Sequence, residues 1–142
     1  MRKFLLLLTL FLISSCEITI GSFSNSFESQ SIFKEERKTV VWKDLLSQEE
    51  ENYYAYIYSE TCGYCKKIEP EIKSFALKHV VYVVLFSEEI PIKPEREDFT
   101  NVDDINSLFI LGTPTLFKIS SKKVDNCYIG FYEIQGHIKE VA

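Results

Sequence analysis

The sequence predicts an α/β fold in which helices pack against a central mixed β-sheet. Two apolar stretches rich in β-branched and aromatic residues, 53–59 and 80–86, are typical of buried strands. The segment between them, 66–79, carries apolar residues at helical spacing, and a strand–helix–strand order favours a parallel crossover. A later pair of strands, 115–120 and 124–131, is separated by a short turn and predicts an antiparallel hairpin.

The first fifteen residues have the pattern of a secretory signal peptide. Arg2 and Lys3 form a charged start, and the mostly apolar run that follows, 4–13, is shorter than the ~20 residues of a membrane-spanning helix. The stretch Ile13-Ser14-Ser15-Cys16 resembles the lipobox of bacterial lipoproteins, which implies cleavage before Cys16 and attachment of lipid to it. The alternative is an ordinary cleaved signal with an incidental cysteine.

The chain therefore divides into a lipoprotein signal peptide (1–15), a flexible tether after a lipidated Cys16 (16–38) and one domain (39–142). We expect an extracytoplasmic protein that is lipid-anchored to the bacterial cell membrane. Removal of Arg2 and Lys3 changes the formal charge from −5 to −7, which excludes attraction to nucleic acid. The expected oligomeric state is a monomer.

Local patterns place the elements of the domain in order. Thr100-x-x-Asp103 is a capping signature, and the apolar residues after it predict a helix to residue 110. The expected elements are an edge strand (39–41), a helix (42–51), a strand (53–59), a helix (66–79), a strand (80–86), a long loop (87–99), a helix (100–110), the hairpin (115–131) and a final helix (132–142).

Two cysteines two residues apart, Cys62 and Cys65, lie where the strand at 53–59 turns into the helix. A helix start carries free N–H groups and partial positive charge, which favour the thiolate, the reactive form of Cys62. Cys65 lies one turn later and can close a disulfide with Cys62. A structural zinc site needs four ligands, and the sequence has no second C-x-x-C motif to supply the other two. A structural disulfide across so short a loop would constrain the unfolded chain little.

The order of elements and several landmarks resemble the thioredoxin family over residues 39–142. The landmarks are Cys62, Cys65, Pro70, Thr113-Pro114 and Gly130. The resemblance implies a thioredoxin fold, a redox role for Cys62 and Cys65 with Gly63 and Tyr64 as the active-site spacer, and a cis peptide at Thr113-Pro114. It also implies that Thr113 and Pro114 shape a substrate groove in which the backbone of Thr113 pairs with an extended peptide.

The active site differs from that of thioredoxin itself. Thioredoxin has Gly-Pro between its cysteines, and it carries a buried Asp six residues before the first one, where this chain has Tyr56. Thr61 to Cys65 together with Thr113-Pro114 looks more like the catalytic domain of periplasmic disulfide isomerases. Among small exported proteins, the chain looks like the thioredoxin-like accessory proteins of bacteriocin export. Tyr56 and Glu60 are candidates for proton handling.

The function expected from these residues is thiol–disulfide exchange with exported proteins, without a metal or other cofactor. The partners would be protein thiols and disulfides and an unidentified redox partner. One alternative is a non-enzymatic accessory subunit of an export or surface complex, since fold alone does not establish activity. Another is a metal carrier in which Cys127 joins Cys62 and Cys65. Otherwise Cys127 is a buried structural cysteine, and His137 is expected at the surface.

The long loop, 87–99, holds two prolines and five acidic residues. It follows the carboxyl end of a strand, the edge of the sheet where Cys62 also lies. Its acids would favour basic clients there, or it is a solvated insertion with no role.

Overall fold

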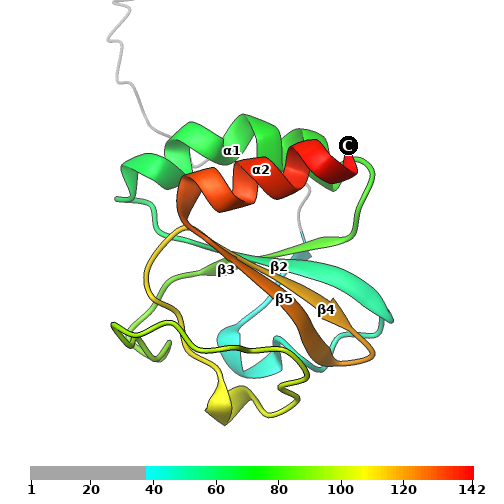
Figure 1. Cartoon of the computed structure of the whole chain (residues 1–142), viewed down its shortest axis with the longest axis vertical. Coiled ribbons are helices and arrows are strands. Elements are labelled where there is room, and N and C mark those ends of the chain that lie inside the picture. Colours follow the sequence, from blue (N-terminus) through cyan, green and yellow to red (C-terminus); the bar gives the residue numbers. More distant parts are fainter. Residues whose placement is uncertain (1–37) are drawn as a thin grey trace, which may run out of the picture.

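The computed structural model describes residues 38–142, which form a five-stranded sheet in the order β1-β3-β2-β4-β5 (Figure 1). The helices and strands are β1 (Lys38–Thr39), β2 (Asn52–Tyr58), α1 (Gly63–Ala76), β3 (Val81–Leu85), β4 (Thr115–Ser120), β5 (Lys123–Ile129) and α2 (Gly130–Val141). Two 3₁₀ turns, η2 (Trp42–Asp44) and η3 (Ile105–Ser107), lie between them.

The sheet is mixed, as predicted. β3 runs parallel to both β1 and β2, whereas β4 is antiparallel to β2 and to β5. β2 therefore lies at the centre, and all of its residues after Asn52 are buried, in agreement with its apolar and aromatic sequence. The expectation of an α/β thioredoxin fold with a central mixed sheet is confirmed.

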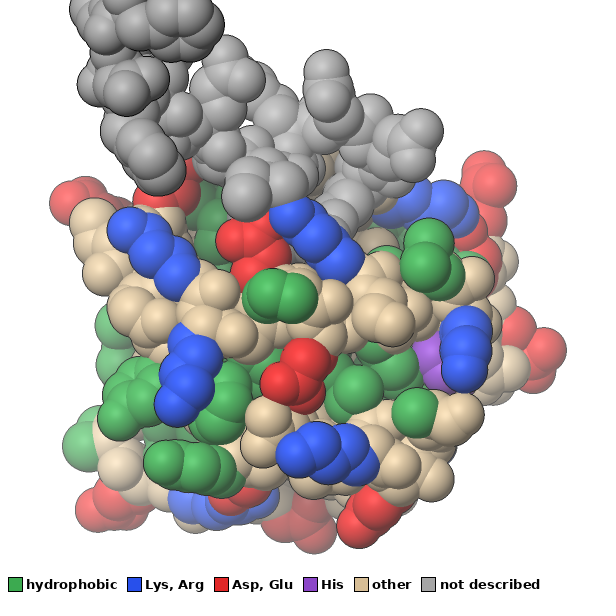
Figure 2. Space-filling model, turned by 90° about the horizontal axis from the view of Figure 1, so that it is seen from above, with side chains coloured by type: hydrophobic (Ala, Val, Ile, Leu, Met, Phe, Trp, Pro, Cys, Tyr) green, Lys and Arg blue, Asp and Glu red, His purple; other side chains and the backbone are tan. Residues whose placement is uncertain are grey.

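Both helices cover the same face of the sheet (Figure 1). α1 buries Ile68, Ile72 and Phe75, and α2 buries Ile134 and Ile138, positions that recur at the three- and four-residue spacing of a helix face. Figure 2 views this face from above, with charged side chains on the outer surfaces of the helices. The strand residues that pack beneath them include Tyr54, Tyr56, Val81, Val83 and Leu116.

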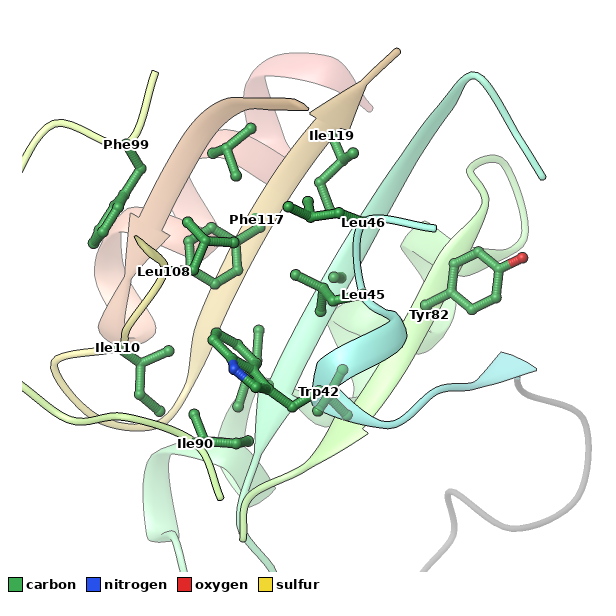
Figure 3. Close-up of a cluster of buried hydrophobic side chains, with 14 of the residues drawn as sticks. Trp42, Leu45, Leu46, Tyr82, Ile90, Phe99, Leu108, Ile110, Phe117 and Ile119 are labelled. Atoms are coloured by element: carbon green, nitrogen blue, oxygen red, sulfur yellow. The ribbon is translucent and has the colours of Figure 1, made fainter. Parts of the chain in front are cut away.

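The opposite face of the sheet is covered by irregular chain. There η2 and the segment between β3 and β4 place apolar side chains on the sheet, and Figure 3 shows how they converge. The cluster includes Trp42, Leu45, Leu46, Ile90, Phe99, Leu108, Ile110, Phe117 and Ile119. On this face, apolar side chains from irregular chain cover the sheet in place of a helix layer.

Two predicted helices are wrong. The segment predicted as a helix over 42–51 forms only the 3₁₀ turn η2, which is sufficient to bury Trp42, Leu45 and Leu46. The segment predicted as a helix over 100–110 contains only η3. Asp104 is the N-cap of η3, and its carboxylate accepts the backbone N–H of Asn106 at 3.0 Å. Ile110 instead forms a parallel bridge with Ile92.

Other boundaries shift by a few residues. α1 begins at Gly63 and not at residue 66, and α2 begins at Gly130 and not at residue 132. The signal peptide (1–15), the lipidation site Cys16 and the tether lie outside the described residues, except that Lys38, the last tether residue, opens β1. Within 38–142, no helix has the length and apolar character needed to cross a bilayer.

Candidate active site

The register of the sheet brings two distant segments together at the carboxyl end of β2. β2 pairs antiparallel with β4 so that Ile57 lies opposite Thr115. Cys62 follows the end of β2 after a short turn, closed by a hydrogen bond from the Cys62 N–H to the Ser59 carbonyl at 3.1 Å. Thr113 and Pro114 immediately precede β4. The pairing of β2 with β4 therefore places the two cysteines beside the Thr113-Pro114 peptide.

Cys62 is the N-cap of α1, as the sequence indicated. Its backbone is extended (φ −78°, ψ 114°), and its sulfur accepts the backbone N–H of Cys65 at 3.1 Å. This N–H belongs to the first turn of the helix and has no carbonyl four residues earlier within it. A sulfur atom here occupies the position that the side-chain oxygen of a capping serine or aspartate fills in other helices.

The environment of Cys62 favours its thiolate. Burial opposes ionisation, but hydrogen bonds from the Cys65 thiol, the Thr113 side chain and the backbone N–H groups of Cys65 and Tyr64 outweigh it. The pKa of Cys62 therefore lies below its ordinary value. The sulfur also lies 3.3 Å from the carbonyl oxygen of Thr113, to which the protonated thiol donates.

Cys65 has the opposite character. Its side chain is only 1% exposed, and burial together with the hydrogen bond to Cys62 raises its pKa to about 11. Tyr56 lies in the same buried cluster, and its pKa is raised far above the ordinary value by burial first and by Cys65 second. The residue at the position of the buried Asp of thioredoxin is thus a neutral phenol next to the dithiol.

The Thr113-Pro114 peptide is cis, as the resemblance implied. Pro114 is buried, and its carbonyl accepts the N–H of Gly130 at 2.8 Å. Gly130 has a positive φ of 78°, a conformation that glycine adopts without steric cost, and it is the residue at which β5 gives way to α2. The start of α2 is therefore fixed against the same loop that faces Cys62.

The remaining residues around the dithiol differ in exposure. Gly63 and Tyr64, the predicted spacer, are exposed, and a Cβ added at Gly63 would meet no atom within 4 Å. Lys66 and Glu60 are exposed as well, so Glu60 lies on the surface turn and not in the buried environment of Cys65. Of the two candidates for proton handling, only Tyr56 lies at the buried thiol.

Cys127 and His137 lie away from this pair. Cys127 is only partly buried, and not fully buried as expected. It packs against the core cluster on the face of the sheet that no helix covers, and burial raises its pKa to about 12. In residues 38–142, no group of three or more potential ligands is arranged to hold a metal ion, so Cys127 does not join Cys62 and Cys65 as the metal-carrier alternative requires.

His137 is buried and not at the surface, which corrects the sequence-based expectation. Its ring stacks on Tyr128 with centroids 3.9 Å apart, and its Nε2 lies 3.1 Å from the Tyr54 hydroxyl. Its spacing from Ile134 and Ile138 places it on the buried face of α2, a signal that the sequence already contained.

The long loop lies against neighbouring elements near both of its ends. Ser87 and Glu89 line a hollow of about 310 Å³ together with Tyr58, the last residue of β2. Near the other end of the loop, the Arg96 guanidinium binds both carboxylate oxygens of Glu133 at 2.6 and 3.1 Å, in the first turn of α2. Opposite charges 37 residues apart carry no local signal, so this link could not be predicted from the sequence.

Comparison with known proteins identifies similar folds but no relative that defines the function. No protein-family model matches the chain, and no curated protein matches it. Among solved structures, the chain is similar to Chlamydomonas reinhardtii thioredoxin f2 (13% identity, 75% of this chain and 96% of that chain, TM-score 0.47). It is also similar to spinach chloroplast thioredoxin f in its long form (15% identity, 74% and 85%, TM-score 0.48).

Plasmodium falciparum thioredoxin is a third such structure (19% identity, 74% of this chain and 99% of that chain, TM-score 0.46). Identities and TM-scores this low do not establish a shared activity, which has to be argued from the site itself.

Proposed function

We propose that this chain is a thiol–disulfide oxidoreductase that acts on exported proteins through Cys62 and Cys65, outside the cytoplasm and tethered to the membrane by lipid on Cys16. The observation that carries the redox proposal is the asymmetry of the two thiols. Cys62 caps α1 and has a lowered pKa, whereas Cys65, one turn later, is buried with a pKa of about 11. An attacking thiolate and a protected resolving thiol need these two environments.

The reaction begins at Cys62. Its thiolate attacks one sulfur of a client disulfide, the client S–S bond breaks, and the departing client thiolate takes up a proton. The product is a mixed disulfide between Cys62 and the client. Hydrogen bonds from the start of α1 stabilise the thiolate before the attack and again when Cys62 leaves in the reverse reaction.

Cys65 completes the exchange. It loses its proton and attacks the Cys62 sulfur, the mixed disulfide breaks, and the second client thiolate leaves and is protonated. Two electrons and two protons have then passed from the dithiol to the client, and Cys62 and Cys65 are joined by a disulfide. The reverse sequence oxidises a client dithiol, and a redox partner restores the starting form.

Thr113 and Pro114 are proposed as the wall of the substrate groove. The Thr113 carbonyl lies 3.3 Å from the Cys62 sulfur, so a client segment joined to that sulfur would pass along the Thr113 backbone. Extended segments bind exposed backbone of this kind by strand-like hydrogen bonds. Pairing here would hold the client cysteine in line for attack without contacts that depend on one client sequence.

Export and anchoring are supported by the sequence. The charged start, the short apolar run and the lipobox-like Ile13 to Cys16 motif together favour an exported lipoprotein. Mass spectrometry of membrane-extracted protein is expected to find a lipidated Cys16 at the N-terminus. An unmodified Cys16, or an N-terminus elsewhere, would count against this part of the proposal.

The redox proposal is tested with single-turnover reduction of a small aromatic disulfide reagent by the reduced full-length chain. Cys62→Ser is expected to abolish the reaction, and Cys65→Ser to accumulate a mixed disulfide that mass spectrometry detects. Cys127→Ser is the matched control, because Cys127 is a partly buried thiol that also has a raised pKa but lies in another element. Equal rates for the wild type and Cys62→Ser would refute the proposal, and no reduction by either protein would favour a non-enzymatic accessory subunit.

A further inference from the structure

Two exposed aromatic side chains flank a buried one at the start of the two helices. Tyr64 and Tyr132 are 56% and 75% exposed, and Phe131, which is 7% exposed, lies between them. The Phe131 ring centroid is 6.2 Å from that of Tyr64 and 5.2 Å from that of Tyr132. We call Tyr64, Phe131 and Tyr132 the aromatic ledge.

The aromatic ledge borders the dithiol. Tyr64 lies two residues after Cys62, in the first turn of α1, and Phe131 and Tyr132 follow Gly130, whose N–H binds the Pro114 carbonyl. Hydrophobic side chains gather at the left of Figure 2, over the end of the molecule where α1 and α2 begin. Any polypeptide joined to the Cys62 sulfur therefore passes within a few residues of these rings.

The geometry of the rings suits a planar partner. The Tyr132 ring is nearly perpendicular to the Phe131 ring, at 86°, and the Tyr64 ring is tilted by 36° from it. The two exposed rings therefore stand at an angle to the ring between them, and aromatic pairs prefer such edge-to-face and offset arrangements. The Lys67 ammonium lies 4.6 Å from the Phe131 centroid and adds a cation that attracts the face of a further ring.

Exposed aromatic rings next to a reacting sulfur point to recognition. Tyrosine and other aromatic residues are enriched where proteins bind partners, because they bury a large area at small entropic cost. Leu77, the C-cap of α1, is also highly exposed, but it lies at the opposite end of the helix from Cys62.

We propose that the aromatic ledge binds an aromatic side chain of the client, located within two residues of the client's disulfide cysteine. The proposal rests on the proposed function, and it names the substrate class of that site as extended segments that carry an aromatic residue beside the reacting cysteine. The client cysteine bonds to Cys62, the adjacent backbone follows Thr113, and the aromatic side chain packs between Tyr64 and Tyr132.

The test compares three disulfide-linked peptides that differ only in the residue next to the cysteine, which is Phe, Leu or Gly. Reduced full-length protein is mixed with each peptide, and the second-order rate of reduction is measured. The Phe peptide is expected to react about tenfold faster than the Gly peptide, and the Leu peptide at an intermediate rate. Tyr132→Ala, and more strongly the double variant with Tyr64→Ala, should bring the Phe-to-Gly ratio close to one.

Leu77→Ala is the control, since it removes an even more exposed apolar side chain (87%) from the C-cap at the other end of α1 and is expected to keep the ratio. Equal rates for all three peptides, or a ratio that survives the double variant, would overturn the proposal. A Leu peptide as fast as the Phe peptide would overturn the aromatic assignment. If the aromatic ledge instead joins two copies, Tyr132→Ala would turn a dimer into a monomer without changing the ratio, which also overturns it.

Failure of the underlying function has a different signature. The wild-type protein would then reduce neither the peptides nor the small disulfide reagent. Reduction of the small reagent with no preference among the peptides would leave the redox function intact and remove only the role of the aromatic ledge.

Discussion

In the reduced protein, we expect iodoacetamide at pH 7 to alkylate Cys62 well before Cys65 or Cys127. The perturbation is chemical, because alkylation requires a thiolate and therefore reports which sulfur is ionised and accessible. The three thiols differ in both respects. Cys62 is half-buried with a lowered pKa, Cys65 is buried, and Cys127 has a pKa raised to about 12.

The expected ratio of rates follows from the pKa values. A thiol with the ordinary pKa of 9.0 is about 1% ionised at pH 7, and Cys62 exceeds this fraction. Cys65, with a pKa of about 11, is about 0.01% ionised. The hundredfold difference is reduced about eightfold because a more basic thiolate is a better nucleophile. At least about a tenfold preference for Cys62 remains, and the burial of Cys65 increases it.

The assay is timed alkylation followed by tandem mass spectrometry, which assigns the label to Cys62, to Cys65 or to Cys16; the last lies outside the described residues. Cys62→Ser is expected to slow the first alkylation in residues 38–142 at least about tenfold. Cys65→Ser is expected to change it little, because a serine hydroxyl keeps a hydrogen-bond donor near the Cys62 sulfur. Faster labelling of Cys65 than of Cys62 would show that the assigned roles are reversed.

Three further predictions concern stability, measured by urea unfolding. Burial lowers the pKa of His137 in the folded protein, so as the pH falls the unfolded chain is protonated at this residue before the folded protein is. The free energy of unfolding should therefore fall as the pH drops below about 6.5. His137→Gln should remove this part of the pH dependence, and an unchanged dependence would contradict the reasoning. Ile72→Ala should cost about 2–5 kcal/mol because Ile72 is fully buried, and a loss below about 1 kcal/mol would argue against its place in the core. The Arg96–Glu133 ion pair is largely exposed, so a double-mutant cycle of Arg96→Ala and Glu133→Gln should give a coupling free energy of at most about 1 kcal/mol. A much larger value would show that this ion pair holds the long loop in place.

The dithiol and its surroundings could be predicted because their signals are local. Cys62 and Cys65 lie at a strand-to-helix boundary that the apolar pattern marks on both sides. The buried strand β3 is a continuous apolar run. In both cases a short stretch of chain determines its own conformation, so no long-range contact had to be known. The cis peptide at Thr113-Pro114 was instead implied by the resemblance to the thioredoxin family.

One face of the sheet is covered by η2 and the segment between β3 and β4, and this covering could not be predicted from local pattern. Trp42, Leu45 and Leu46 have helical spacing, yet a single 3₁₀ turn buries all three side chains. Leu108, Phe109 and Ile110 are consecutive and each only 1% exposed, a pattern that no one-sided helix can satisfy. Their burial depends on contacts with the sheet and with Ile92, which lie far away in the sequence.

The uneven covering of the sheet has a consequence for the evolution of this chain. On the helical face, an insertion inside α1 or α2 would rotate every later side chain of that helix out of its packing position. On the other face, separate apolar residues anchor irregular chain, and the polar residues between them lie exposed in the loop. Insertions there cost mainly the small entropy of a longer loop. The irregular face can therefore diverge in length and charge between descendants while Cys62 and Cys65 stay in register.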